Sequence, residues 1–88
     1  MRIQVRRTGG FAGIERRAEV DTSTRPDAEE WQALAGRVLA SGLATPPAGV
    51  PDGFSYEISV DGRTVYAADP RLTEDQRELV SLVLKEGA

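Results

Sequence analysis

Apolar and polar residues alternate in four segments of the chain, which is the pattern of β-strands with one buried face. These segments are Arg2–Arg7, Arg16–Thr22, Phe54–Val60 and Arg63–Ala68. The first segment carries Ile3 and Val5 on one side and polar residues on the other. The third segment alternates most clearly, with apolar residues at every second position. The pattern therefore predicts four strands.

The third and fourth segments are joined by Asp61-Gly62, a dipeptide that strongly favours a two-residue hairpin turn. A turn this short also sets the register of the two strands. It predicts two cross-strand pairs on the inner side of the sheet, Ile58 with Val65 and Tyr56 with Ala67.

Two other segments repeat apolar residues every three or four positions, which predicts amphipathic helices at Asp27–Ala40 and Glu74–Lys85. The apolar stripes contain Trp31, Leu34, Ala35, Val38 and Leu39 in the first helix, and Leu79, Val80 and Val83 in the second. Acidic residues at the start of both helices suit the positive end of the helix dipole.

Residues at the helix ends predict specific caps. Thr24 precedes Asp27 by three positions, so we expect an approximate capping box at the first helix. Thr73 and Gln76 have the same spacing and predict a capping box at the second helix. Gly42 follows the first helix and predicts a left-handed C-cap.

Two hairpins, each followed by a helix, give the order β-β-α-β-β-α. The economical arrangement is an α+β fold with one four-stranded antiparallel sheet and two helices packed on one face. We expect residues 1–88 to form a single domain, in which the Pro- and Gly-rich stretch Ala44–Gly53 is a connector. The outer face of the sheet is expected to be solvated, and its residues include Arg2, Gln4, Glu57, Ser59 and Thr64.

The segment Thr8–Glu15, which joins the first two strands, differs from an ordinary hairpin turn. Its three glycines allow unusual backbone conformations, and two large apolar residues, Phe11 and Ile14, stand among them. In one interpretation this is a wide hairpin whose apolar side chains fold back onto the core. In the other it is an exposed apolar loop that enters a partner's pocket. The residues alone leave both interpretations open.

The composition argues against an enzyme. The chain has no cysteine and no histidine, so it lacks the usual ligands of zinc and the usual imidazole base. A hydroxyl without an activating base is a poor nucleophile. We therefore expect a protein that is not an enzyme and that has no cofactor, and no metal in its free form. Absence of cysteine, of a long apolar run and of a signal-peptide pattern predicts a cytoplasmic protein that does not enter a membrane.

The charge argues against nucleic-acid binding. The formal net charge is −3, whereas nucleic-acid modules usually carry a basic face. A small basic cluster is conceivable around the Gly-rich segment, formed by Arg6, Arg7, Arg16 and Arg17. The same residues also fit solvated positions that discourage aggregation through the sheet edge. We expect no nucleic-acid partner.

The opening segment Met1–Ile14, with its Gly9-Gly10-Phe11-Ala12 stretch, resembles the start of the emfourin family. The resemblance also covers Val20-Asp21, Phe54-Ser55-Tyr56, Val60-Asp61-Gly62-Arg63 and Leu72–Leu84. It spans most of the chain in order, and the Gly-Gly-Phe-Ala stretch is its distinctive part. Emfourins are small bacterial protein inhibitors of protealysin and other thermolysin-like zinc metallopeptidases.

The resemblance implies that the Gly-rich segment 8–15 enters the active-site cleft of such a peptidase. The implied protease-binding residues are Gly9, Gly10, Phe11, Ala12, Gly13, Ile14 and Glu15. Ile14, or else Phe11, would fill the apolar pocket of the enzyme. Glu15 would place a carboxylate near the zinc or its neighbouring arginine, and the glycines would allow close approach of the backbone.

The implied partner is a protealysin-type metallopeptidase, and we expect the inhibitor to be a monomer when free. An alternative stays open. The chain would then be a small non-enzymatic regulatory or protein-binding module whose apolar loop docks on a partner that is not a protease.

Overall fold

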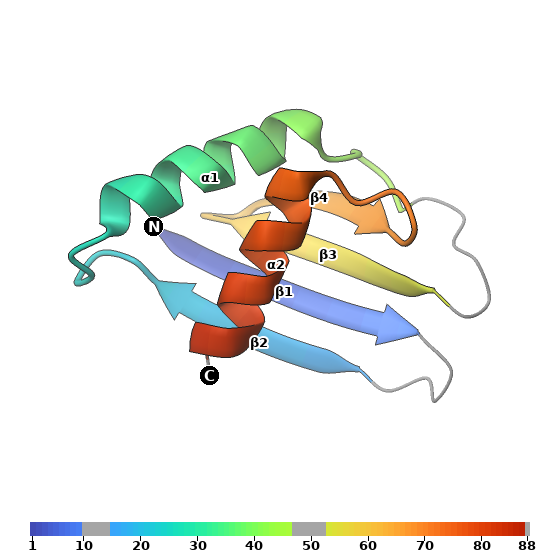
Figure 1. Ribbon diagram of the computed structural model, residues 1–88, viewed down its shortest axis with the longest axis horizontal. Coiled ribbons are helices and arrows are strands. Elements are labelled where there is room, and N and C mark those ends of the chain that lie inside the picture. The colour runs from blue at the N-terminus through green and yellow to red at the C-terminus, as the bar shows by residue number, and fades with distance from the viewer. Residues whose placement is uncertain (10–14, 47–52, 88) are drawn as a thin grey trace.

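The computed structural model describes residues 1–9, 15–46 and 53–87. Its elements are β1 (Arg2–Gly9), β2 (Arg16–Asp21), α1 (Ala28–Ser41), β3 (Phe54–Val60), β4 (Arg63–Ala68) and α2 (Glu74–Glu86). Figure 1 shows the four strands in one sheet with the two helices lying across it. The predicted α+β class and the order β-β-α-β-β-α are confirmed.

The strands are all antiparallel and follow the order β2-β1-β3-β4 across the sheet. The two hairpins therefore join through β1 and β3, which are the central strands (Figure 1). β1 pairs with β3 as far as Gly9, which lies opposite Phe54. β1 pairs with β2 only as far as Arg7, opposite Arg16. The first strand extends past its predicted end at Arg7 because β3 continues to supply hydrogen-bonding partners.

The turn between β3 and β4 confirms the predicted hairpin. Asp61 and Gly62 have φ angles of 49° and 87°, the pair of positive values that a two-residue type I′ turn requires. Both predicted cross-strand pairs are present. The turn also contacts β1. The backbone N–H of Arg2 donates to Asp61 Oδ1 at 2.8 Å, and the Asp61 N–H donates to the Arg2 carbonyl at 3.0 Å.

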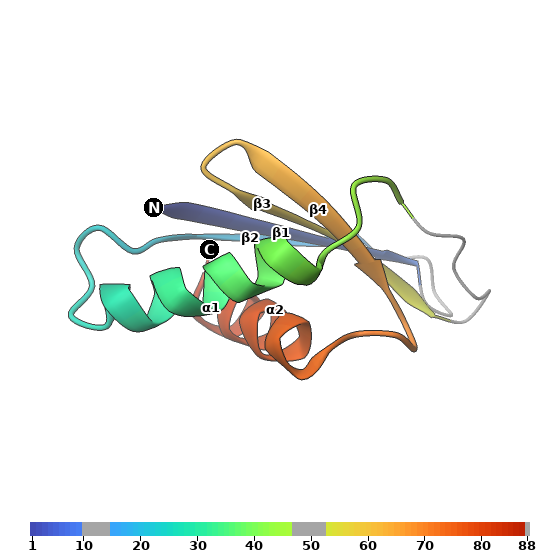
Figure 2. The same ribbon diagram turned by 90° about the horizontal axis from the view of Figure 1, so that it is seen from above.

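Both helices cover the same face of the sheet, as Figure 2 shows. α2 packs across β1 and β2, while α1 packs against α2 and β4. The inner face of the strands and the stripes of the helices together form one apolar cluster. Its most deeply buried large members include Ile3, Val5, Val38, Ile58, Leu79 and Val83. Alternation in the strands and the stripes in the helices thus identified the core.

The predicted caps have different outcomes at the two helix starts. At α2 the capping box is confirmed: Thr73 Oγ1 accepts from the Gln76 N–H at 3.1 Å, and the Thr73 N–H donates to Gln76 Oε1 at 3.0 Å. At α1 the box predicted from Thr24 and Asp27 is wrong. Asp27 is itself the N-cap and makes no side-chain cap hydrogen bond. Its carboxylate pairs instead with Arg25, at 3.2 Å between Oδ1 and Nε.

The left-handed cap predicted at Gly42 is also wrong. Gly42 has an extended backbone, with φ −77° and ψ 158°. Space explains the glycine, because a Cβ there would lie 2.5 Å from Val65 Cγ2. The following residue, Leu43, exchanges backbone hydrogen bonds of 3.0 and 2.9 Å with Tyr66 of β4. The chain therefore leaves α1 directly along the edge of the sheet.

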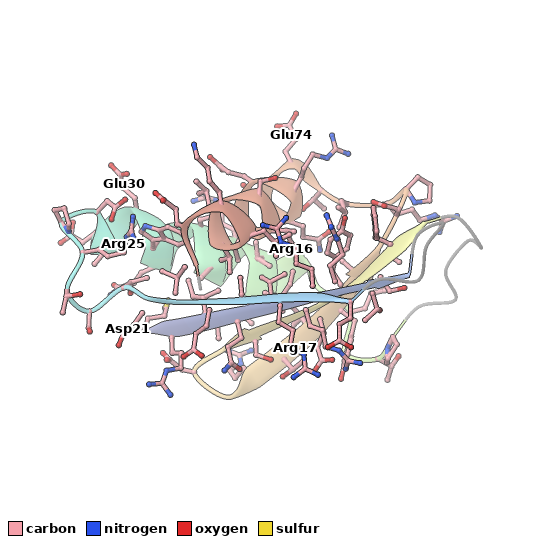
Figure 3. All side chains as sticks on the ribbon, turned by 90° about the horizontal axis from the view of Figure 1, so that it is seen from below. Arg16, Arg17, Asp21, Arg25, Glu30 and Glu74 are labelled. Carbon is pink, nitrogen blue, oxygen red and sulfur yellow. The ribbon has the colours of Figure 1, made fainter. Side chains whose placement is uncertain are left out.

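No helix or strand among the described residues covers the outer face of the sheet, and its polar side chains interact with one another. Figure 3 shows them on the side of the sheet opposite the helices. Arg2 Nε lies 2.7 Å from Glu19 Oε1, and the hydroxyls of Ser59 and Thr64 share a hydrogen bond of 2.8 Å. The predicted polar outer face is present, and part of its polarity is satisfied by pairs between neighbouring strands.

Candidate functional site

The structure describes two of the seven residues predicted for the site, Gly9 and Glu15. The roles predicted for Gly10, Phe11, Ala12, Gly13 and Ile14 fall outside the described residues and stay predictions. Gly9 is the last residue of β1, and Glu15 directly precedes β2. These two residues therefore mark the points at which the Gly-rich segment joins the sheet, at the end of β1 in Figure 1.

Gly9 occupies a position that only glycine can fill without strain. Its φ angle is +95°, a conformation that side chains with a Cβ rarely adopt. A Cβ at this position would also lie 2.9 Å from the carbonyl oxygen of Gly53, which is backbone and cannot rotate away. The glycine thus lets β1 run close to the chain that enters β3.

The Pro-rich connector ends beside the Gly-rich segment. Gly53 lies against Gly9, and the next residue, Phe54, donates its N–H to Asp69 Oδ2 at 3.1 Å. The ends of β1 and β4 and the start of β3 therefore meet at one end of the sheet (Figure 1). The sequence predicts only a connector at Ala44–Gly53, without this contact. No local pattern reveals it, because β1 and β3 are far apart in the chain.

Glu15 lies on the outer face, where two arginines bind its carboxylate. Arg17 Nε donates to Oε1, and Arg6 Nη2 lies 3.2 Å from Oε2. The hydrogen bond from Arg17 lowers the pKa of Glu15 below its usual value of 4.5. Partial desolvation opposes this shift, while the charges of Arg17 and Arg6 reinforce it. Glu15 is thus ionised at neutral pH and already has two cationic partners within its own chain.

The four arginines that flank the Gly-rich segment do not form one basic cluster. Arg6 and Arg17 are cross-strand neighbours on the outer face, and Arg7 and Arg16 are neighbours on the face that carries the helices. Figure 3 shows Arg16 and Arg17 on opposite sides of the sheet. Alternation along a strand separates adjacent residues in this way. The positive charge is therefore divided between two faces and does not form a stripe that could follow a phosphate backbone.

The two inner arginines have structural partners. The guanidinium of Arg7 lies 4.3 Å from the ring centroid of Phe54, within the range of a cation–π interaction. Arg16 Nη2 donates to the carbonyl of Leu84 in α2 at 2.8 Å. These contacts attach the end of β1 to β3 and the start of β2 to α2.

Within residues 1–9, 15–46 and 53–87, no group of three or more acidic, His or Cys side chains could hold a metal ion. In the same residues, neither helix is long and apolar enough to cross a membrane. A hollow of 540 Å³ lies beside β4, between the end of α1 and the start of α2, and half-exposed Leu43 lines it. This hollow offers exposed apolar surface.

Comparison with known proteins identifies the family. The sequence model named Emfourin matches residues 5–84 of the 88-residue chain. The chain belongs to the Emfourin family. No curated protein and no solved structure matches it. The Emfourin match includes the Gly-rich segment, the Pro-rich connector, α1 and α2 as far as Leu84.

Emfourin is a family of protease inhibitors, so membership supports an inhibitor role in general and a protease as the class of partner. It also supports a protein that is not itself an enzyme. In this member of the family, Gly9, Gly53 and Glu15 lie at the same end of the sheet. The described residues of the candidate site are thus the supports of the Gly-rich segment.

Proposed function

We propose that this Emfourin-family protein inhibits a thermolysin-like zinc metallopeptidase by inserting the Gly-rich segment 8–15 into the active-site cleft. The family match over residues 5–84 is the observation that carries the proposal. The sheet also supports the proposal, because Gly9 at the end of β1 and Glu15 before β2 join the segment to it. Binding loops are commonly held by a rigid scaffold of this kind. The proposal includes a monomeric free inhibitor in the bacterial cytoplasm.

In this proposal Ile14 or Phe11 fills the apolar pocket of the enzyme, and the glycines allow close approach of the two backbones. The zinc belongs to the peptidase, so the inhibitor needs no metal and no cofactor of its own. The contact between Gly9 and Gly53 adds one element to the proposed interface. A peptidase that binds the Gly-rich segment will also meet the end of the Pro-rich connector.

The decisive test is titration of a protealysin-type peptidase with the purified protein, with a serine protease as the control enzyme. We expect saturable loss of metallopeptidase activity at stoichiometric inhibitor and no effect on the serine protease. Loss of a central apolar anchor usually costs about 2 kcal/mol or more. Either Phe11→Ala or Ile14→Ala should therefore raise the inhibition constant at least about thirtyfold.

A matched control comes from the helix layer. Glu30 is exposed on α1, on the side of the sheet opposite Arg17, the partner of Glu15 (Figure 3). Glu30→Ala should leave the inhibition constant unchanged. Unchanged constants in both Phe11→Ala and Ile14→Ala would exclude the Gly-rich segment as the inhibitory element, even if the protein still inhibits.

One observation favours the second candidate, a regulatory module with a partner that is not a protease. Leu43 is 50% exposed beside the 540 Å³ hollow, and exposed apolar surface of this kind can serve as a contact site. If this candidate is correct, Leu43→Ser should weaken partner binding while inhibition of metallopeptidases is absent from the start. Inhibition of the metallopeptidase by the wild-type protein would exclude this candidate.

A further inference from the structure

The carboxylate of Glu15 is held by arginines from both strands of the first hairpin. Arg6 belongs to β1 and Arg17 to β2, and they face each other across the hairpin. Each arginine binds a different oxygen of the Glu15 carboxylate: Arg17 binds Oε1, and Arg6 binds Oε2. Arg6 also reaches Glu57 of β3, with Nη1 3.4 Å from Oε2. One network thus connects Glu15 to β1, β2 and β3.

This network lies where backbone pairing stops. Among the described residues, the last pair between β1 and β2 is Arg7 with Arg16. Beyond them, Thr8 and Gly9 continue to pair with β3. Glu15 is outside every strand and forms no ladder with β1. Backbone pairing with β3 thus holds the β1 end of the Gly-rich segment as far as Gly9, whereas Glu15, at the β2 end, is held by its ion pairs and by its bond to the paired Arg16.

We propose that Glu15 is a positioning residue that fixes the point where the Gly-rich segment enters β2, and that it does not bind the peptidase directly. This inference rests on the proposed inhibitor function for its effect on affinity. The carboxylate already has one arginine partner on each oxygen, so a cation on the enzyme would compete with two ion pairs that the free protein already makes. Fixing the end of a binding segment before association reduces the conformational entropy lost on binding.

Isosteric substitutions test this assignment. Glu15→Gln keeps the shape of the side chain and removes its charge, and the double variant Arg6→Gln/Arg17→Gln removes both cations. We expect Glu15→Gln to weaken inhibition about two- to tenfold, the range expected from losing one or two exposed ion pairs. In the double-variant background, Glu15→Gln should cause no further loss. A role limited to global stability would leave inhibition by the folded variants unchanged.

The direct-contact hypothesis makes the opposite prediction. If Glu15 binds the zinc or an arginine of the peptidase, Glu15→Gln weakens inhibition by the same factor in both backgrounds. That result would overturn the assignment. Arg2→Gln is the matched control, because it removes an ion pair with Glu19 from the same face of the sheet. It should leave the inhibition constant unchanged.

A measurement on the free protein separates this inference from the proposed function. Backbone ¹⁵N order parameters report fast motion residue by residue. We expect lower values for residues 10–16 in Glu15→Gln and in Arg17→Gln than in the wild type, and no change in Arg2→Gln. Order parameters that do not change in any variant would refute the positioning role. Lower values together with an absence of inhibition would support that role and refute only the inhibitor function.

Discussion

Replacing glycines by alanine at matched positions separates backbone strain from close contact at the candidate site. Gly9 and Gly62 have similar positive φ angles, 95° and 87°. Alanine in this region costs about 1–2 kcal/mol. A Cβ at Gly62 meets no heavy atom within 4 Å, so we expect that strain to be its whole effect. A Cβ at Gly9 lies 2.9 Å from the carbonyl oxygen of Gly53.

The contact at Gly9 adds a second cost, because a backbone atom can yield only if the strand moves. Overpacking of this kind typically costs about 1–3 kcal/mol. We therefore expect Gly9→Ala to lower the free energy of unfolding by about 2–5 kcal/mol. Gly36→Ala is a control that should change the free energy of unfolding in the opposite direction. Gly36 lies within α1 with open space around it, so alanine should stabilise the protein by about 1 kcal/mol.

Urea unfolding followed by tryptophan fluorescence can measure all three variants. Trp31 is the single tryptophan and is only 4% exposed, so its emission should report loss of the core. The expected order of unfolding midpoints is Gly36→Ala above wild type, then Gly62→Ala, then Gly9→Ala, with similar m-values. If Gly9→Ala is no less stable than Gly62→Ala, β1 does not approach Gly53 as described. The contact between Gly9 and Gly53, which we propose supports the Gly-rich segment, would then be wrong.

Three further predictions concern caps, core and charge. Thr73→Ala should lower the free energy of unfolding by about 1 kcal/mol, whereas Thr24→Ala should change it by less than about 0.5 kcal/mol, because only Thr73 makes a cap hydrogen bond. Equal effects in thermal unfolding would contradict this. Leu79→Ala should cost about 2–5 kcal/mol, because Leu79 is fully buried, and a urea midpoint near the wild-type value would argue against this core. The pKa of Glu15 is lowered from 4.5 by Arg17, so its ion pairs hold above pH 4.5 and are lost as the pH falls through the lowered pKa. In an NMR titration Arg17→Gln should raise that pKa, and an unchanged value would refute the pairing.

Local sequence signals predicted most of the fold because their physical causes are local. Alternation in β3 and the turn at Asp61-Gly62 set both the hairpin and its register, since a two-residue turn leaves one pairing. The cap at α2 was also predictable, because Thr73 and Gln76 satisfy each other's backbone within one turn. The distinctive residues of the Gly-rich segment indicated the Emfourin family, which the family match confirms.

Local signals failed at both ends of α1, where another residue competed for the predicted cap. Thr24 has the spacing of a cap, but α1 begins only after Asp27, whose carboxylate pairs with Arg25. Gly42 resembles a left-handed cap, yet it is the side chain of Val65 that leaves no room for a Cβ there. Neither competitor could be inferred from spacing within the helix.

The sequence by itself determined which residues form strands, helices and core, together with the family and the segment that distinguishes it. Only the tertiary structure decided how that segment is supported. The pairing of β1 with β3 places Gly9 against Gly53, 44 positions away, and brings Arg6 to Glu57, 51 positions away. Such contacts depend on strand order, and strand order is set by packing of the whole sheet against its helices. This is why the arrangement around Glu15 became visible only in the folded chain.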